Sequence, residues 1–150
     1  MKLPQKDRTD RFLWFASLIL AVIGAADAVY LLVLKFTQSE AMCIGNHGCV
    51  TVNNSPYSTI YNIPVSLLGL MAYLSIILIL SMEPRLPVVK TYGRIISFGL
   101  ALTGTLFSGY LTYLEYFVIY AVCPFCMISA VVISLILILS TIRLVRQSLP

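Results

Sequence analysis

Four cysteines in two pairs are the residues of this chain whose type and spacing could do chemistry. Five residues separate Cys43 from Cys49, and two of them are glycines, which make a short ring easy to close and to bend. Cys123 and Cys126 form a Cys-Pro-Phe-Cys motif. A Cys-x-x-Cys pair is typical of thiol–disulfide exchange, in which a thiolate attacks a disulfide sulfur. The two pairs therefore predict a relay of two dithiols.

The composition of the chain excludes an ordinary soluble domain. Of its 150 residues, 59% are hydrophobic and 11% are charged, and the mean hydropathy is +0.93. Soluble domains carry about 25% charged residues, so this chain has too few charges to cover a surface that faces water. Its ten basic residues are not clustered as a nucleic-acid-binding face requires. Lipid is therefore expected to be its main solvent.

Four apolar runs are long enough to cross a membrane as helices. They predict an all-α membrane protein, a four-transmembrane-helix bundle that forms a single domain over residues 1–150. A long loop, from about residue 35 to 63, is expected between the first and second helices. The expected spans are residues 12–34, 64–82, 95–114 and 122–142.

The basic residues predict the orientation of the bundle. Nine of the ten would lie on one side of four spans, and Lys35 would lie on the other. Because cytoplasmic loops carry an excess of lysine and arginine, both termini are expected in the cytoplasm. All four cysteines then fall on the extracytoplasmic side, where disulfides form and persist.

The Cys-Pro-Phe-Cys motif lies where the fourth span is expected to begin. Pro124 suits the first position of a helix, so Cys123 is expected to be its N-cap. Cys126 then lies in the first turn, where free backbone amides and the helix dipole stabilise a thiolate. It also lies deeper than Cys123, on the side from which a lipid-soluble oxidant would arrive.

Two other interpretations of the cysteines remain open. The first is a pair of structural disulfides, although four packed spans have little need of covalent cross-links. The second is a metal site that combines His47 with some of the thiols. An oxidising compartment disfavours this second interpretation, because it removes free thiolates.

Further residues follow the cysteines in a specific order. After Cys49 comes Val-Asn-Asn-Ser-Pro-Tyr-Ser at 52–58, and the second span opens with Ile-Pro-Val-Ser-Leu-Leu-Gly at 63–69 and continues to Tyr73. The fourth span opens with Cys-Pro-Phe-Cys at 123–126. With these motifs in this order, the chain from about residue 12 to 142 resembles the bacterial and archaeal members of the vitamin K epoxide reductase family.

The resemblance implies a membrane thiol oxidase that forms disulfides in secreted proteins and passes the electrons to a quinone, of the ubiquinone or menaquinone type. Cys43 and Cys49 would exchange with a thioredoxin-like partner, one of them would attack the Cys123–Cys126 disulfide, and Cys126 would reduce the quinone. Many bacterial relatives carry a fused thioredoxin-like domain. Because this chain ends at Pro150, its partner is expected to be a separate extracytoplasmic protein.

Three polar residues are expected beside the quinone together with Cys126. The resemblance places Ser55 next to the reactive pair, whereas Asp27 and Glu115 lie near the outer ends of the first and third spans. Quinone reduction consumes two protons, which such acids could supply. The alternative is that both acids lie at the membrane interface and that Ser55 is an ordinary turn residue. Most tyrosines near the outer surface are expected to anchor the spans, with one or two lining the quinone pocket: Tyr57, Tyr61, Tyr110, Tyr113, Tyr116 and Tyr120.

Two positions depart from the family pattern. Ala130 stands where vertebrate relatives have a tyrosine that binds the quinone head group. This difference argues against epoxide reduction and leaves quinone reduction intact. Asn62 stands where the family commonly has a glycine, directly before the Ile-Pro of the second span.

Overall fold

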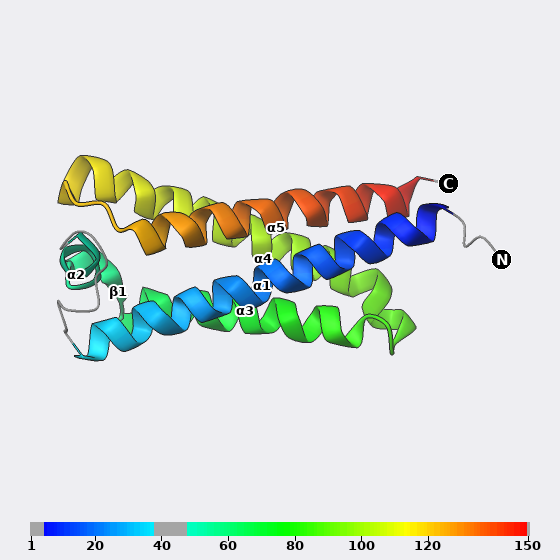
Figure 1. The fold of residues 1–150 in the computed structure, drawn as a ribbon, viewed down its shortest axis with the longest axis horizontal. Coiled ribbons are helices and arrows are strands. Elements are labelled where there is room, and N and C mark those ends of the chain that lie inside the picture. Colours follow the sequence, from blue (N-terminus) through cyan, green and yellow to red (C-terminus); the bar gives the residue numbers. More distant parts are fainter. Residues whose placement is uncertain (1–4, 38–47, 150) are drawn as a thin grey trace.

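The computed structural model describes residues 5–37 and 48–149 of the chain, with side chains from residue 8 onward. Within this part, four helices are long and apolar enough to cross a membrane. They lie side by side along one long axis (Figure 1) and confirm the predicted four spans. The helices are α1 (Gln5–Thr37), α3 (Val65–Met82), α4 (Pro87–Leu114) and α5 (Pro124–Ser148).

The short elements gather at one end of the bundle. They are α2 (Gly48–Asn53), a 3-10 turn (Pro56–Ser58), and the two-residue strands β1 (Thr59–Ile60) and β2 (Ile63–Pro64). We call these elements together the cap. A π-helical turn (Glu115–Ile119) follows α4 at the same end, which we call the cysteine end. The start of α1, the end of α5 and the α3–α4 connection lie at the opposite end, here called the termini end (Figure 1).

The helices begin and end at different residues from those expected. α4 begins at Pro87 rather than at residue 95, with Pro87 in its first turn. Proline is favoured there because it has no N–H to leave unpaired. Lys90 and Arg94 consequently belong to the first turns of α4 and not to a loop. α5 begins at Pro124, directly after Cys123, as the sequence predicted.

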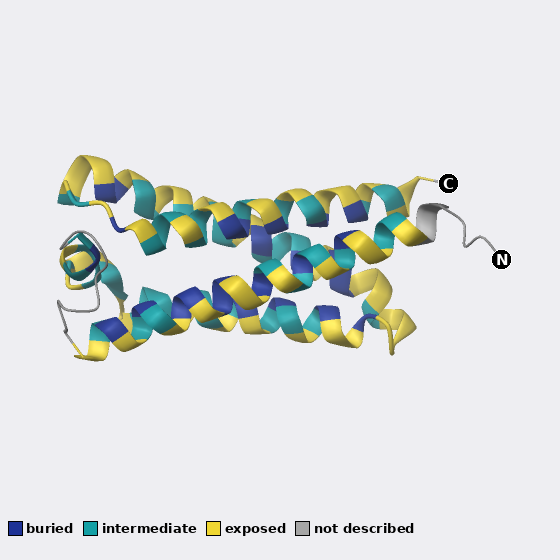
Figure 2. Cartoon of the chain, in the orientation of Figure 1, coloured by how far each residue is buried: buried dark blue, intermediate teal, exposed yellow. Residues whose placement is uncertain are grey.

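The outer surface of the bundle is apolar. Large hydrophobic side chains such as Phe12 on α1, Leu78 on α3, Leu106 on α4 and Val131 on α5 are all more than half exposed. Exposed and buried positions alternate around each helix (Figure 2), and many of the exposed ones are apolar. This surface suits hydrocarbon, into which charged groups would transfer only at a large cost.

The interior is packed through small residues. Ala21, Ala25 and Ala28 of α1 and Ala101 of α4 are buried around Ile76 and Ile136. Lipid chains are as apolar as leucine, so the hydrophobic effect does not drive helices together inside a membrane. Close approach at small side chains gives the van der Waals contact that replaces it.

The turn between β1 and β2 explains the unusual Asn62. The two strands pair antiparallel, with Ile60 opposite Ile63, and leave Tyr61 and Asn62 as the turn. These two residues have φ values of 50° and 65°, which is the pattern of a tight hairpin with positive φ at both positions. Asparagine tolerates this left-handed conformation better than most residues, so it replaces glycine here without breaking the turn.

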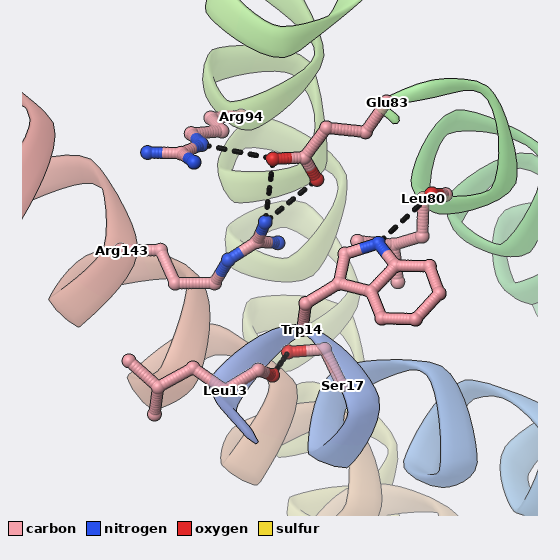
Figure 3. Close-up of polar contacts among 7 residues, drawn as sticks. All are labelled: Leu13, Trp14, Ser17, Leu80, Glu83, Arg94 and Arg143. Carbon is pink, nitrogen blue, oxygen red and sulfur yellow. Dashed lines mark hydrogen bonds and ion pairs between the residues drawn. The ribbon is translucent and has the colours of Figure 1, made fainter. Parts of the chain in front are cut away.

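A buried ion cluster ties three helices together at the termini end. Glu83, directly after α3, accepts from Arg143 Nη2 of α5 with both carboxylate oxygens at 2.6 Å and from Arg94 Nε of α4 at 3.1 Å. Figure 3 shows the carboxylate between the two guanidinium groups. Nearby, Trp14 Nε1 of α1 donates to the carbonyl of Leu80 at 2.9 Å. All four helices are therefore joined by polar contacts at this end.

We predict that Glu83→Ala strongly destabilises the bundle. Arg94 and Arg143 are 9% and 4% exposed, and loss of the carboxylate leaves two buried cations without their partner. Breaking a buried pair in this way costs about 3–5 kcal/mol. The free energy of unfolding in mixed micelles, followed by circular dichroism, measures the change. As the control, Arg146→Gln removes a more exposed ion pair with Asp10 and should cost at most about 1 kcal/mol; equal losses in the two variants would contradict the assignment.

Candidate functional site

The cap brings a loop cysteine against the Cys-Pro-Phe-Cys motif. Cys49 lies in α2, and its Sγ is 3.2 Å from Cys123 Sγ. Both side chains are buried, in a small cluster that also contains Leu31 and Leu34 of α1. Of the loop pair, Cys43 lies outside the described residues. The structure therefore joins one member of each predicted dithiol in direct contact.

Polar contacts hold the cap on the end of α1. Lys35 Nζ donates to the carbonyl of Asn53 at 2.8 Å and to Ser58 Oγ at 2.6 Å. Asn53 Nδ2 in turn donates to the carbonyl of Leu31 at 2.9 Å. These bonds fix the last residue of α2 and the last residue of the 3-10 turn. The basic residue that the charge pattern set apart from the other nine therefore fastens the cap.

Gly48 permits the close approach of Cys49. A Cβ atom at this position would collide with the backbone carbonyl of Val122, which directly precedes Cys123. The start of α2 thus lies against the backbone of the reactive segment. Glycine is needed here because any side chain would push Cys49 away from Cys123.

Cys123 is the N-cap of α5, as expected from Pro124, and its Sγ accepts from the backbone N–H of Cys126 at 3.4 Å. The first-turn amide of Cys126, which was expected to stabilise a thiolate at Cys126 itself, donates to Cys123 Sγ instead. Hydrogen bonds from the Cys126 side chain, the Cys126 N–H and Cys49 outweigh burial and lower the pKa of the Cys123 thiol to about 7. The Cys123 thiol therefore loses its proton more readily than an isolated thiol does.

A cavity of about 350 Å³ lies between the cap and the four helices. Its walls are mostly apolar side chains, and Cys126 forms part of them. Its size is within the range of pockets that bind small organic molecules. Cys126 thus faces the cavity, while Cys123 lies between Cys126 and the loop cysteine.

The predicted polar residues divide into two groups. Ser55 and Glu115 line the same cavity as Cys126, so three of the expected quinone-side residues come together. Asp27 does not line it, although it is largely buried and its neighbour Ala28 does. The sequence places Asp27 at the same depth in the membrane as the cavity. On α1, however, its side chain lies on a different face from Ala28, which lines the cavity.

Two residues of the cavity wall were not predicted as functional. Ser66 lines the cavity, and its buried hydroxyl has no hydrogen-bond partner among the described residues. Tyr73 also lines it and bonds through its hydroxyl to Ser129 Oγ at 3.0 Å. Ser66, Gly69 and Tyr73 follow i, i+3, i+7 spacing, which places them on one face of α3. This spacing is the sequence signal from which Ser66 and Tyr73 could have been predicted. Among the six outer tyrosines, Tyr57 reaches the cavity wall.

The alternative metal site depends on His47, which lies outside the described residues. In the part of the chain that the structure describes, no three side chains of the metal-binding types are placed to hold an ion. Among the described residues, Cys49, Cys123 and Cys126 form no disulfide with one another. The geometry of the site is therefore that of thiols in contact beside an apolar cavity.

Comparison with known proteins agrees with this arrangement. The model of the vitamin K epoxide reductase family matches residues 15–141, and the chain belongs to that family. It is also similar to the thiol-disulfide oxidoreductase LTO1 of Arabidopsis thaliana, with 33% identity over 111 residues. That alignment covers 69% of this chain and 29% of the plant protein, so the chain spans less than a third of this relative's length. With its four apolar helices, the chain fits an integral membrane protein of the family.

We predict that Gly48→Ala slows the reaction between Cys49 and Cys123. In a Cys43→Ser, Cys126→Ser background, these two thiols remain, and a mild oxidant should couple them rapidly because their sulfur atoms are already in contact. A displacement of about 1 Å by the added methyl should reduce the rate about 10-fold to 100-fold. Peptide mapping by mass spectrometry measures the cross-linked fraction over time.

Gly109→Ala is the matched control for this experiment, since a Cβ there meets no atom within 4 Å. It should leave the coupling rate unchanged. If Gly48→Ala couples as fast as the control, α2 is not held against Val122 as described.

Proposed function

We propose that the chain is a quinone-dependent, disulfide-forming oxidoreductase of the membrane. One observation carries the proposal: Cys49 Sγ lies 3.2 Å from Cys123 Sγ, while Cys126 forms part of the cavity wall. The loop dithiol and the motif dithiol thus connect at one buried contact. The plant relative, itself named as a thiol-disulfide oxidoreductase, supports chemistry of this class.

The contact supports Cys49, rather than Cys43, as the residue that attacks the motif. A dithiol protein would first reduce the Cys43–Cys49 disulfide. The Cys49 thiolate would then attack Cys123 Sγ, and the Cys123–Cys126 disulfide would break with Cys126 as the leaving thiolate. Attack of Cys43 on Cys49 would restore the loop disulfide and release Cys123. Two electrons would thereby pass from the loop pair to the motif pair.

This arrangement favours the relay over two structural disulfides. Two structural disulfides, one within each pair, would not require Cys49 of the loop pair to contact Cys123 of the motif pair. Burial of Cys49 and Cys123 together also shields their exchange from other thiols. A low pKa makes Cys123 a good leaving group when Cys43 resolves the mixed disulfide, because thiols of lower pKa leave faster.

The cavity suits a quinone of the ubiquinone or menaquinone type. Its apolar walls fit a ring with an isoprenoid tail, and the unpaired Ser66 hydroxyl is a free donor for a ring carbonyl. Such a quinone supplies a two-electron acceptor that moves within the lipid. Cys126 would face it, and Ser55 and Glu115 would be the other polar groups around it, whereas Asp27 has no place in this wall.

We propose that the termini end faces the cytoplasm. Arg85 and Lys90 lie near the α3–α4 connection, and Arg146 lies in the last turn of α5. The excess of basic residues there follows the rule for cytoplasmic segments. The cysteine end would then face the extracytoplasmic compartment, and its dithiol partner would be a separate thioredoxin-like protein of that compartment.

The proposal is tested with the full chain in liposomes that contain a quinone, supplied with a reduced thioredoxin-like protein. The wild-type protein should oxidise that protein and form hydroquinone in equal amounts. Cys126→Ala should lower both rates to the uncatalysed level, because it removes the thiol that lies in the described cavity wall. Ser75→Ala, whose side chain bonds within α3 and does not line the cavity, should retain full activity. Full activity of Cys126→Ala would overturn the relay.

A further inference from the structure

Glu115 is a buried acid at the reactive end of the molecule, with 2% of its surface exposed. The ion pairs of the described residues lie elsewhere, between Glu83, Arg94 and Arg143 and between Asp10 and Arg146. A carboxylate without a cationic partner is costly to bury. A buried Glu115 beside the cysteines therefore indicates a role for its carboxylate other than ion pairing.

The backbone of Glu115 fixes the segment that leads to Cys123. α4 changes at this residue into a π-helical turn, and its carbonyl accepts from the N–H groups of Tyr120 and Ala121. Tyr120 ends the turn with a positive φ of 54°. π-helical turns of this kind occur frequently at functional sites. The turn swings the chain across the cysteine end and directs the Glu115 side chain toward the motif.

The side chain of Glu115 contacts the motif itself. Its Oε2 accepts from the backbone N–H of Cys123 at 3.2 Å. The Cys126 side chain is close enough to the same carboxylate for hydrogen-bonding and charge interactions. Glu115 and Cys126 also line the same cavity. One carboxylate therefore bonds to the backbone of the first motif cysteine and shares the wall of one cavity with the thiol of the second.

We propose that Glu115 is a catalytic residue that accepts the proton of the Cys126 thiol while it holds Cys123 in place. The inference rests on the proposed function, in which the motif dithiol gives two electrons to a quinone. In that step the Cys126 S–H bond breaks, its proton passes to the Glu115 carboxylate, and the Cys123–Cys126 bond forms. The electron pair and two protons, one from Glu115 and one from the outer aqueous phase, end on hydroquinone.

The charges around Glu115 suit this role. The titratable groups that interact with the carboxylate and with each other are Cys49 from α2, Cys123 before α5 and Cys126 in α5. Lys35 at the end of α1 donates to Asn53 and Ser58 of the cap. Cys123 Sγ already accepts the N–H of Cys126, whereas Cys126 lines the cavity beside Glu115, so Cys126 is the thiol whose proton must be removed.

Glu115→Gln separates proton transfer from positioning, because the amide oxygen still accepts from the Cys123 N–H but is not a base. In anaerobic single turnovers of the reduced full chain with quinone at pH 7, we expect it to slow oxidation of the motif by about 10²–10⁴-fold, the usual contribution of a general base. The rate should then rise about tenfold per pH unit, since hydroxide must remove the proton. Exchange between Cys49 and Cys123, measured without quinone, should be unchanged.

A second readout needs no quinone. Infrared difference spectra between the oxidised and reduced protein should show a Cys126 S–H band shifted by the negative charge of the Glu115 carboxylate. That shift should be lost in Glu115→Gln. Glu115→Asp keeps the base and lengthens the bond to Cys123, so it should keep the pH profile of the wild type while slowing exchange. Glu115→Asp therefore tests whether residue 115 accepts the proton even if Glu115→Gln does not fold.

The outcomes separate this inference from the proposed function. If the wild type reduces quinone and Glu115→Gln shows the same rate, pH profile and S–H band, the proton role is wrong and Glu115 only positions Cys123. If Glu115→Asp becomes as steeply pH-dependent as expected for the glutamine variant, the role is equally wrong. If the wild type itself does not reduce quinone, the proposed function fails instead.

Discussion

The contact between Cys49 and Cys123 is the interaction on which the rest of the structure depends. Thiol–disulfide exchange requires two sulfur atoms to meet, and these two lie 3.2 Å apart in a buried site. The hydrogen bonds of Lys35 hold the cap on α1, the absence of a side chain at Gly48 lets α2 reach Val122, and Glu115 holds the Cys123 backbone. Each of these features brings one of the two sulfur atoms to its place.

The membrane explains why the polar groups lie at the two ends of the bundle. Between the ends, the helices meet through small residues and present large apolar side chains outward. The Glu83 cluster closes the termini end, where three helices share one carboxylate. The cysteine end is hollow instead, with a cavity between the cap and the helices. The bonded termini end and the cavity at the cysteine end together hold the helices in place and leave room beside Cys126.

Much of this could be predicted from the sequence, because it follows from local chemistry. Apolar run length predicted the four spans, and Pro124 predicted that Cys123 caps α5. Other features depend on tertiary contacts. Whether Cys43 or Cys49 meets the motif is decided by how the cap folds, and the lowered pKa of the Cys123 thiol follows from its neighbours in space. Asp27 lies outside the cavity wall, because depth along a helix does not specify which face a side chain occupies.

The central claim is that electrons pass from the loop pair through Cys123 and Cys126 to a quinone. Its most direct test starts from fully reduced protein, mixed anaerobically with one equivalent of quinone and quenched with an alkylating reagent at successive times. Peptide mapping by mass spectrometry then identifies each disulfide. The account predicts one hydroquinone per protein, with Cys123–Cys126 as the first disulfide and Cys43–Cys49 appearing later at its expense. Formation of Cys43–Cys49 first, or of either disulfide without hydroquinone, would contradict it.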